Sequence, residues 1–150
     1  NAYIIMLGLE SLGVRMERHC ENALALAKYL KNHDRVEWVN YAALPDDKYY
    51  DVCKKITGGH ASGIISFGIK GGKNAGAKFI DALQMILRVL SMGDAKSLAC
   101  HPASTLHRQL TSEQKALAGV SEDLVRISVG IEHIDDIIAD VEQAIEASKK

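Results

Sequence analysis

The chain has 150 residues, of which 47% are hydrophobic and 25% charged, and its formal net charge at pH 7 is -1. This length and composition predict a single globular domain with a core of its own. The near-neutral charge excludes a general electrostatic attraction to nucleic acid or to an anionic membrane, and no apolar run is long enough to span a bilayer.

The first predicted element is a long helix from about Tyr3 to His33. Apolar residues recur along it every three or four positions, as on one face of an amphipathic helix, whereas Gly8 and Gly13 weaken or bend its first half. The first two turns are apolar nearly all round, which predicts a second partner surface at this end. Because the chain has no initiator Met and starts almost inside an element, we expect it to be part of a larger polypeptide.

Short strands and helices alternate through the rest of the chain. The predicted strands cover residues 36–41, 63–69, 96–100 and 124–129, and the predicted helices cover residues 48–56, 74–90, 113–118 and 133–147. Such alternation is compatible with a parallel α/β sheet. The strands are few and the helices differ widely in length, so we predict instead an α+β fold, a small and mainly antiparallel sheet with helices on one face.

The last predicted strand, from Leu124 to Val129, carries a guanidinium. Successive side chains of a strand point to opposite faces, so Val125 and Ile127 face the helices while Arg126 points to the other face. A guanidinium on a rigid strand is well placed to donate two parallel hydrogen bonds to a carboxylate or a phosphate. The alternative is an ordinary solvated arginine, because exposed charges are the norm.

Three other stretches carry weaker chemical signals. The glycine-rich run 68–76 lacks the ending of a P-loop and the dinucleotide fingerprint, which favours a plain strand-to-helix turn. Cys100, His101 and His107 fit no common metal template, and no Gly-x-Ser-x-Gly elbow is present. The loop from His101 to Leu110 is long and polar, as functional loops often are. The residues alone therefore predict only a polar edge able to bind an anion.

The three cysteines are Cys20, Cys53 and Cys100. An odd number of widely spaced cysteines predicts neither a disulfide framework nor a zinc site. Reduced thiols are typical of cytosolic proteins, so we expect a cytoplasmic protein.

Several motifs together resemble the C-terminal domain of the Cys/Met-metabolism family of pyridoxal-phosphate (PLP) enzymes. The motifs are Gly8 to Leu12, Arg15 to His19, Val36 to Tyr41, Phe67 to Gly72, Gly93 to Leu98, His101 to Thr105 and Leu124 to Asp140. The resemblance covers essentially the whole chain. It implies that residues 1–150 are the small domain of a two-domain enzyme whose large domain is absent, with the first helix continuing from that large domain.

The same resemblance implies site residues. In this family the arginine of the Arg-x-Ser-x-Gly block holds the α-carboxylate of the amino-acid substrate, and here that arginine is Arg126. The residue at Ser91 lies at the same carboxylate. One loop lies toward the active site without individual roles for its members, which are His101, Ser104, Thr105 and His107.

The Schiff-base lysine of the family stands in a Ser-x-Thr-Lys context, which no lysine of this chain has. The resemblance therefore implies that the missing domain binds PLP and that this chain has no catalytic, cofactor-binding or metal-binding residue. Alone it is expected to be inactive. The full-length enzyme is expected to be a homo-oligomer, a tetramer, in which this domain meets its own large domain and neighbouring subunits, with no nucleic-acid or membrane partner.

Within the family the likeness is greatest to O-acetylhomoserine sulfhydrylases. It implies a methionine-biosynthesis enzyme that replaces the acetate of O-acetyl-L-homoserine by sulfide to give homocysteine, with PLP as the electron sink. A cystathionine synthase or γ-lyase is the alternative within the family. A stand-alone α+β module that binds a small carboxylate through Arg126 is the alternative outside it.

Overall fold

The computed structural model describes residues 2–149. Its elements, in chain order, are α1 (Ala2–Glu10), α2 (Leu12–Lys31), β1 (Val36–Asn40), α3 (Tyr50–Thr57), β2 (Ile64–Ile69), α4 (Gly72–Ala82), β3 (Leu87–Arg88), β4 (Leu98–Cys100), the 3-10 turn η1 (Pro102–Ser104), α5 (Ser112–Leu117), β5 (Leu124–Ser128) and α6 (Ile134–Ala147). Among these helices, none combines the length and apolar character needed to cross a membrane.

The five described strands form one sheet in the order β1-β2-β5-β4-β3. Strand β2 runs antiparallel to both β1 and β5, and β5 runs antiparallel to β4. The short edge strand β3 pairs in parallel with β4. The prediction of an α+β fold with a mainly antiparallel sheet is therefore confirmed.

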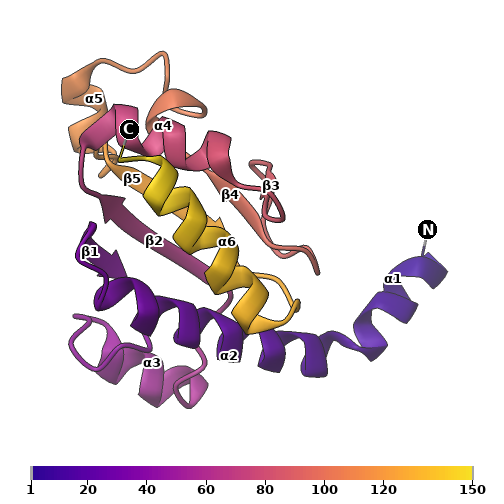
Figure 1. Cartoon of the computed structure of the whole chain (residues 1–150). Coiled ribbons are helices and arrows are strands. Elements are labelled where there is room, and N and C mark those ends of the chain that lie inside the picture. Colours follow the sequence, from indigo (N-terminus) through magenta and orange to yellow (C-terminus); the bar gives the residue numbers. More distant parts are fainter. Residues whose placement is uncertain (1, 150) are drawn as a thin grey trace.

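Helices α2, α4 and α6 lie side by side on one face of the sheet, with α6 between the other two (Figure 1). The core forms between these helices and the strand residues that face them, and Phe67 of β2 meets Phe79 of α4 edge to face at 5.7 Å between ring centroids. The strand side chains in this core are completely buried: Ile65, Phe67, Ile69, Val125 and Ile127. The alternation predicted for β5 thus orients that strand correctly.

Helix α1 projects away from the body of the domain (Figure 1), and none of its residues is buried. The predicted long helix is interrupted at Ser11, where Arg15 donates hydrogen bonds to the Ser11 hydroxyl at 3.1 Å and to the Gly8 carbonyl oxygen at 2.6 Å. The large apolar side chains at its start are 61–70% exposed: Tyr3, Ile4, Ile5 and Met6. Within residues 2–149 the apolar side chains of α1 thus stay exposed, as is typical of surfaces that contact another protein.

The helix predicted for residues 74–90 is wrong beyond Ala82. Helix α4 ends there because Leu83 is extended, with φ -60° and ψ 135°. The chain then reverses and adds β3 to the edge of the sheet. Apolar residues that continue the helical spacing in the sequence, such as Ile86, therefore pack into the core from this reversed segment and not from a helix.

The cause of this reversal is a carboxylate on another helix. Asp140 of α6 is buried, and its two oxygens accept three consecutive backbone N–H groups at 2.8–3.0 Å. The donors are Gln84, Met85 and Ile86. A buried carboxylate that satisfies three backbone donors outweighs the weak helical preference of those residues. The apolar periodicity of residues 83–90 does not indicate that Asp140 binds their backbone.

Two helical glycines are expected to respond oppositely to alanine. A Cβ on Gly76 of α4 would lie 2.6 Å from ring atoms of the buried His101, whereas nothing lies within 4 Å of a Cβ on Gly13 of α2. Gly76→Ala should therefore destabilise the chain by about 1–3 kcal/mol through overpacking, despite a propensity gain of about 1 kcal/mol. Gly13→Ala should stabilise it by about 0.5–1 kcal/mol. Urea unfolding of both variants measures the two effects, and a stabilised Gly76→Ala chain would contradict the packing.

Candidate functional site

A row of side chains crosses the open face of the sheet at Arg126. The strand register places Asn40 of β1 beside Ser66 of β2, Ser66 beside Arg126 of β5, and Arg126 beside Cys100 of β4. Directly paired residues of antiparallel strands point to the same face. All four side chains therefore lie on the face opposite the helix-covered core.

The guanidinium of Arg126 stays on this open face. Its Nη2 donates a 2.6 Å hydrogen bond to the backbone carbonyl oxygen of Leu90. No carboxylate in residues 2–149 forms an ion pair with it. Because its partner is a neutral carbonyl and no described carboxylate pairs with it, the guanidinium can bind an external carboxylate.

The thiol beside Arg126 leaves that charge intact. Cys100 is buried, and burial raises the pKa of its thiol, although the charge and hydrogen bond of Arg126 act in the opposite direction. An uncharged thiol at neutral pH does not neutralise the guanidinium. The cation of Arg126 is therefore the charge that this row offers to a ligand.

The structure brings the segment that contains Ser91 next to Arg126. Ser91 directly follows Leu90, whose carbonyl oxygen holds Arg126, and the Ser91 side chain is exposed. Two residues later, the Gly93 backbone N–H donates to the Ser128 hydroxyl oxygen at 3.0 Å. Thus the segment that contains Ser91 contacts Arg126 through the carbonyl oxygen of Leu90, although the segment and Arg126 are far apart in the sequence.

A cavity of about 310 Å³ lies beside Arg126 on the open face. Strands β1, β2 and β5 contribute Trp38, Asn40 and Ser66 to its lining as well as Arg126, and the loop after β4 contributes His107. Sequence reasoning missed Trp38, Asn40 and Ser66 as lining residues. The alternation within each strand allows each of them to share a face with Arg126, but the pairing that puts the strands side by side is not visible in the sequence.

The loop residues predicted to lie toward the active site divide into two groups. His101 is completely buried; its Nε2 donates to the Glu122 carbonyl oxygen at 2.9 Å and its Nδ1 accepts from the Ser104 hydroxyl at 2.8 Å. The Thr105 hydroxyl donates to the His101 carbonyl oxygen at 2.9 Å. These three side chains hold the shape of the loop, and of the four only His107 lines the cavity.

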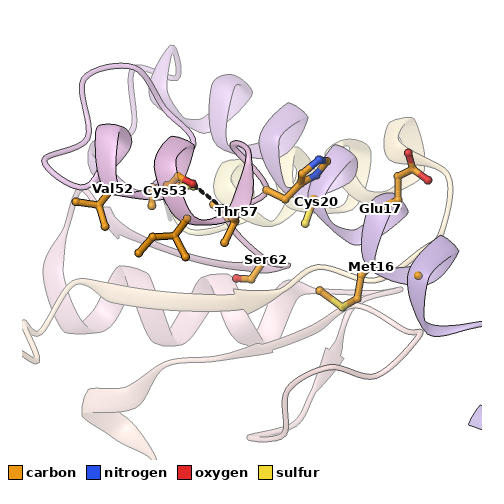
Figure 2. A pocket seen from close by; sticks show the side chains of 12 residues that line it. Met16, Glu17, Cys20, Val52, Cys53, Thr57 and Ser62 are labelled. Carbon is orange, nitrogen blue, oxygen red and sulfur yellow. Dashed lines mark hydrogen bonds between the residues drawn. The ribbon is translucent and has the colours of Figure 1, made fainter. Parts of the chain in front are cut away.

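A larger cavity of about 820 Å³ lies between α2 and α3 (Figure 2). Its lining is mostly apolar, with Met16 and Cys20 from α2 and Val52 and Cys53 from α3 (Figure 2). It shares no lining residue with the cavity beside Arg126. Its lining contains no arginine or lysine that could pair with an α-carboxylate, so it fits an apolar contact better than an amino-acid substrate site.

One cluster of metal-ligand types occurs in the described chain, at His33, Glu142 and Glu146. The Nδ1 of His33 accepts the Arg35 backbone N–H at 3.0 Å, so the ring hydrogen is on Nε2, which lies 3.0 Å from a Glu142 oxygen. Glu142 also accepts the Tyr29 hydroxyl, and burial and this carboxylate raise the pKa of Tyr29. With both ring nitrogens occupied, the cluster joins the segment after α2 to α6 and leaves no free imidazole lone pair for a metal.

A protein-family model described as Cys/Met metabolism PLP-dependent enzyme matches residues 1–146. The chain is 47% identical over 146 residues to a homocysteine synthase of Schizosaccharomyces pombe, covering 97% of this chain and 34% of that protein. It is 49% identical over 146 residues to an O-acetyl-L-homoserine sulfhydrylase of Leptospira meyeri, covering 97% of this chain and 33% of that protein. It is 45% identical over 148 residues to an L-methionine gamma-lyase of Pseudomonas putida, covering 99% of this chain and 37% of that protein.

A solved Campylobacter jejuni chain, assigned as an O-acetylhomoserine (thiol)-lyase, has the same fold with a TM-score of 0.91 and 41% identity. The similarity covers 97% of this chain and 35% of that one, which carries N'-pyridoxyl-lysine-5'-monophosphate at position 205. The present chain thus spans about a third of the length of the curated relatives that it matches.

Proposed function

The chain belongs to the Cys/Met metabolism family of PLP-dependent enzymes, and from this premise we propose that it is the small, substrate-binding domain of an O-acetyl-L-homoserine sulfhydrylase. The whole enzyme replaces the acetate of O-acetyl-L-homoserine by sulfide and releases homocysteine. Identities of 44–49% to proteins named for this activity support the proposal. The observation that carries it is the cation of Arg126, which lies on the open sheet face without an acidic partner in residues 2–149.

In this proposal Arg126 holds the α-carboxylate of the substrate. A guanidinium presents parallel N–H groups that match the two oxygens of a carboxylate, so the pair fixes orientation as well as position. Ser91 lies in the segment that contacts the guanidinium through Leu90 and is exposed, so its hydroxyl is available to the same carboxylate. His107 contributes to the wall of the adjoining cavity.

The lysines of the described chain do not fit a covalent PLP site. Lys115 is the buried lysine in residues 2–149, and its Nζ donates to a Glu122 oxygen at 2.7 Å. The other described lysines are exposed. A Schiff-base lysine must be free and deprotonated, so we assign PLP binding to the part of the polypeptide outside this chain. The domain alone is then inactive.

The partner that the proposal requires also has a surface to bind. Helix α1 exposes apolar side chains on all sides, and exposed apolar area of this kind marks a contact with another protein surface. We assign α1 to the large domain of the same polypeptide, with neighbouring subunits of a homo-tetramer completing the enzyme. The free cysteines Cys20, Cys53 and Cys100 are consistent with a cytoplasmic enzyme.

The substrate proposal is tested with the complete polypeptide that contains this domain, purified with PLP. It is expected to form homocysteine from O-acetyl-L-homoserine and sulfide with a kcat/KM more than about tenfold above that for methanethiol release from L-methionine. The reverse preference would assign the enzyme to the γ-lyases, the second candidate, which the 45% identity to the Pseudomonas putida protein favours. Absence of both activities would favour a carboxylate-binding module.

A further inference from the structure

The segment that contacts Arg126 is attached to the sheet at both ends. On one side, the Leu87 backbone N–H donates to the Ser97 carbonyl oxygen at 3.0 Å as β3 joins β4. On the other side, the Gly93 N–H donates to the hydroxyl oxygen of Ser128 at 3.0 Å. The residues between these attachments include Leu90 and Ser91, whose side chains are exposed and therefore supply little packing of their own.

Ser128 is well suited to define the position of this segment. It is 2% exposed and lies two residues after Arg126 on β5, so both side chains point to the same sheet face. Its hydroxyl reaches the Gly93 N–H, and the Leu90 carbonyl oxygen reaches the Arg126 guanidinium at 2.6 Å. Strand β5 thus holds the segment of residues 90–93 through two hydrogen bonds: Ser128 accepts one from the segment, and Arg126 donates one to it.

We propose that Ser128 is a positioning residue for the carboxylate anchor. By accepting the Gly93 N–H it keeps the Leu90 carbonyl oxygen against Nη2 of Arg126 and keeps Ser91 beside the guanidinium. The carbonyl occupies one edge of the guanidinium and leaves the other N–H groups for the carboxylate. This proposal rests on the proposed function, because it assigns Ser128 a role only in binding the amino-acid substrate.

The geometry also explains why a side chain with a hydroxyl group suits this position. A buried hydroxyl is small enough for the crowded face between β2 and β4 and can accept a backbone hydrogen bond, whereas alanine leaves the Gly93 N–H without this acceptor. Threonine keeps the oxygen. Gly93 has a φ of 81°, a conformation that side-chain-bearing residues rarely adopt, so the bend that presents its N–H to Ser128 is built into the segment.

The first test measures amide hydrogen exchange in the whole 150-residue chain. Ser128→Ala is expected to increase the exchange rate of the Gly93 amide about tenfold, the factor that one ordinary hydrogen bond contributes. Ser128→Thr should keep the native rate. The matched control is Ser148→Ala, because Ser148 is also a buried serine and its hydroxyl bonds the Ile145 carbonyl oxygen at the end of α6. Unchanged exchange at Gly93 in Ser128→Ala would overturn the proposed attachment.

The second test measures kinetics in the complete, PLP-loaded polypeptide. Ser128→Ala is expected to raise KM for the amino-acid substrate about tenfold and to leave kcat within about twofold, and Ser128→Thr should restore KM. Ser148→Ala should leave KM unchanged. In the Arg126→Ala background, Ser128→Ala should add nothing further, because its effect passes through the guanidinium.

These outcomes separate the two proposals. If Arg126→Ala raises KM and Ser128→Ala does not, the positioning role is wrong and the carboxylate anchor stands. If Arg126→Ala itself leaves KM unchanged, the anchor fails, and the exchange test still decides whether Ser128 holds the segment. A KM increase in Ser128→Ala that persists in full in the Arg126→Ala background would overturn a role that acts through Arg126.

Discussion

Replacing Arg126 by alanine in the complete enzyme is expected to lower kcat/KM for the amino-acid substrate roughly 30- to 5,000-fold. This corresponds to a loss of about 2–5 kcal/mol of transition-state stabilisation. The reason is that, if Arg126 is the proposed anchor, the substrate carboxylate would enter a partly buried site without its counter-charge. The Leu90 carbonyl oxygen, which accepts from Nη2 in the native domain, would add a second unpaired acceptor to the same place. Steady-state kinetics with O-acetyl-L-homoserine at saturating sulfide measure the loss.

Two further variants make this measurement specific. Arg126→Lys keeps the charge and loses the bidentate fork, so its kcat/KM should lie between those of the native enzyme and the alanine variant. Arg35→Ala is the matched control, because Arg35 is also half-buried and its Nη2 donates to a backbone carbonyl oxygen, that of Lys70, at 2.9 Å. Its kcat/KM should stay within about twofold of native. Native kcat/KM in Arg126→Ala would remove the proposed anchor.

Replacing Asp140 by alanine is expected to reduce the free energy of unfolding of the chain by about 3–5 kcal/mol. The buried carboxylate accepts three backbone N–H groups from residues 84–86, and one of its oxygens also accepts the side-chain amide of Gln143 at 3.0 Å. Alanine would leave these donors buried or half-buried without their partner. Urea unfolding, followed by circular dichroism, measures the change at constant m-value.

Asp140→Asn separates the hydrogen bonds from the volume of the side chain. It keeps one acceptor oxygen and turns an NH2 group toward backbone donors, so its stability should lie between those of the native chain and the alanine variant. Asp136→Ala on the exposed first turn of the same helix should cost less than about 1 kcal/mol, the usual effect of a helix-dipole charge. A loss below 1 kcal/mol in Asp140→Ala would show that the turn after α4 forms without this carboxylate.

The amino-acid sequence by itself determined which face of β5 carries Arg126. Alternation along a strand is a local property with a period of two, and Val125 and Ile127 on the buried face confirm it. The order of most elements also follows from local patterns, because turns, apolar spacing and strand-forming residues lie within each segment. The mainly antiparallel sheet was predicted from the small number of strands and the uneven lengths of the helices. The family motifs identified the relatives for the same reason, since they are contiguous blocks of residues.

Only the tertiary structure decided which distant groups meet. The pairing register placed Ser66 and Cys100 on either side of Arg126, and the Leu90 carbonyl oxygen took one N–H of the guanidinium. Asp140 ended the helix that the apolar spacing of residues 83–90 had extended. Each of these outcomes depends on a hydrogen bond or a strand pairing between segments far apart in the chain, and such partners leave no periodic signal in the residues that they hold.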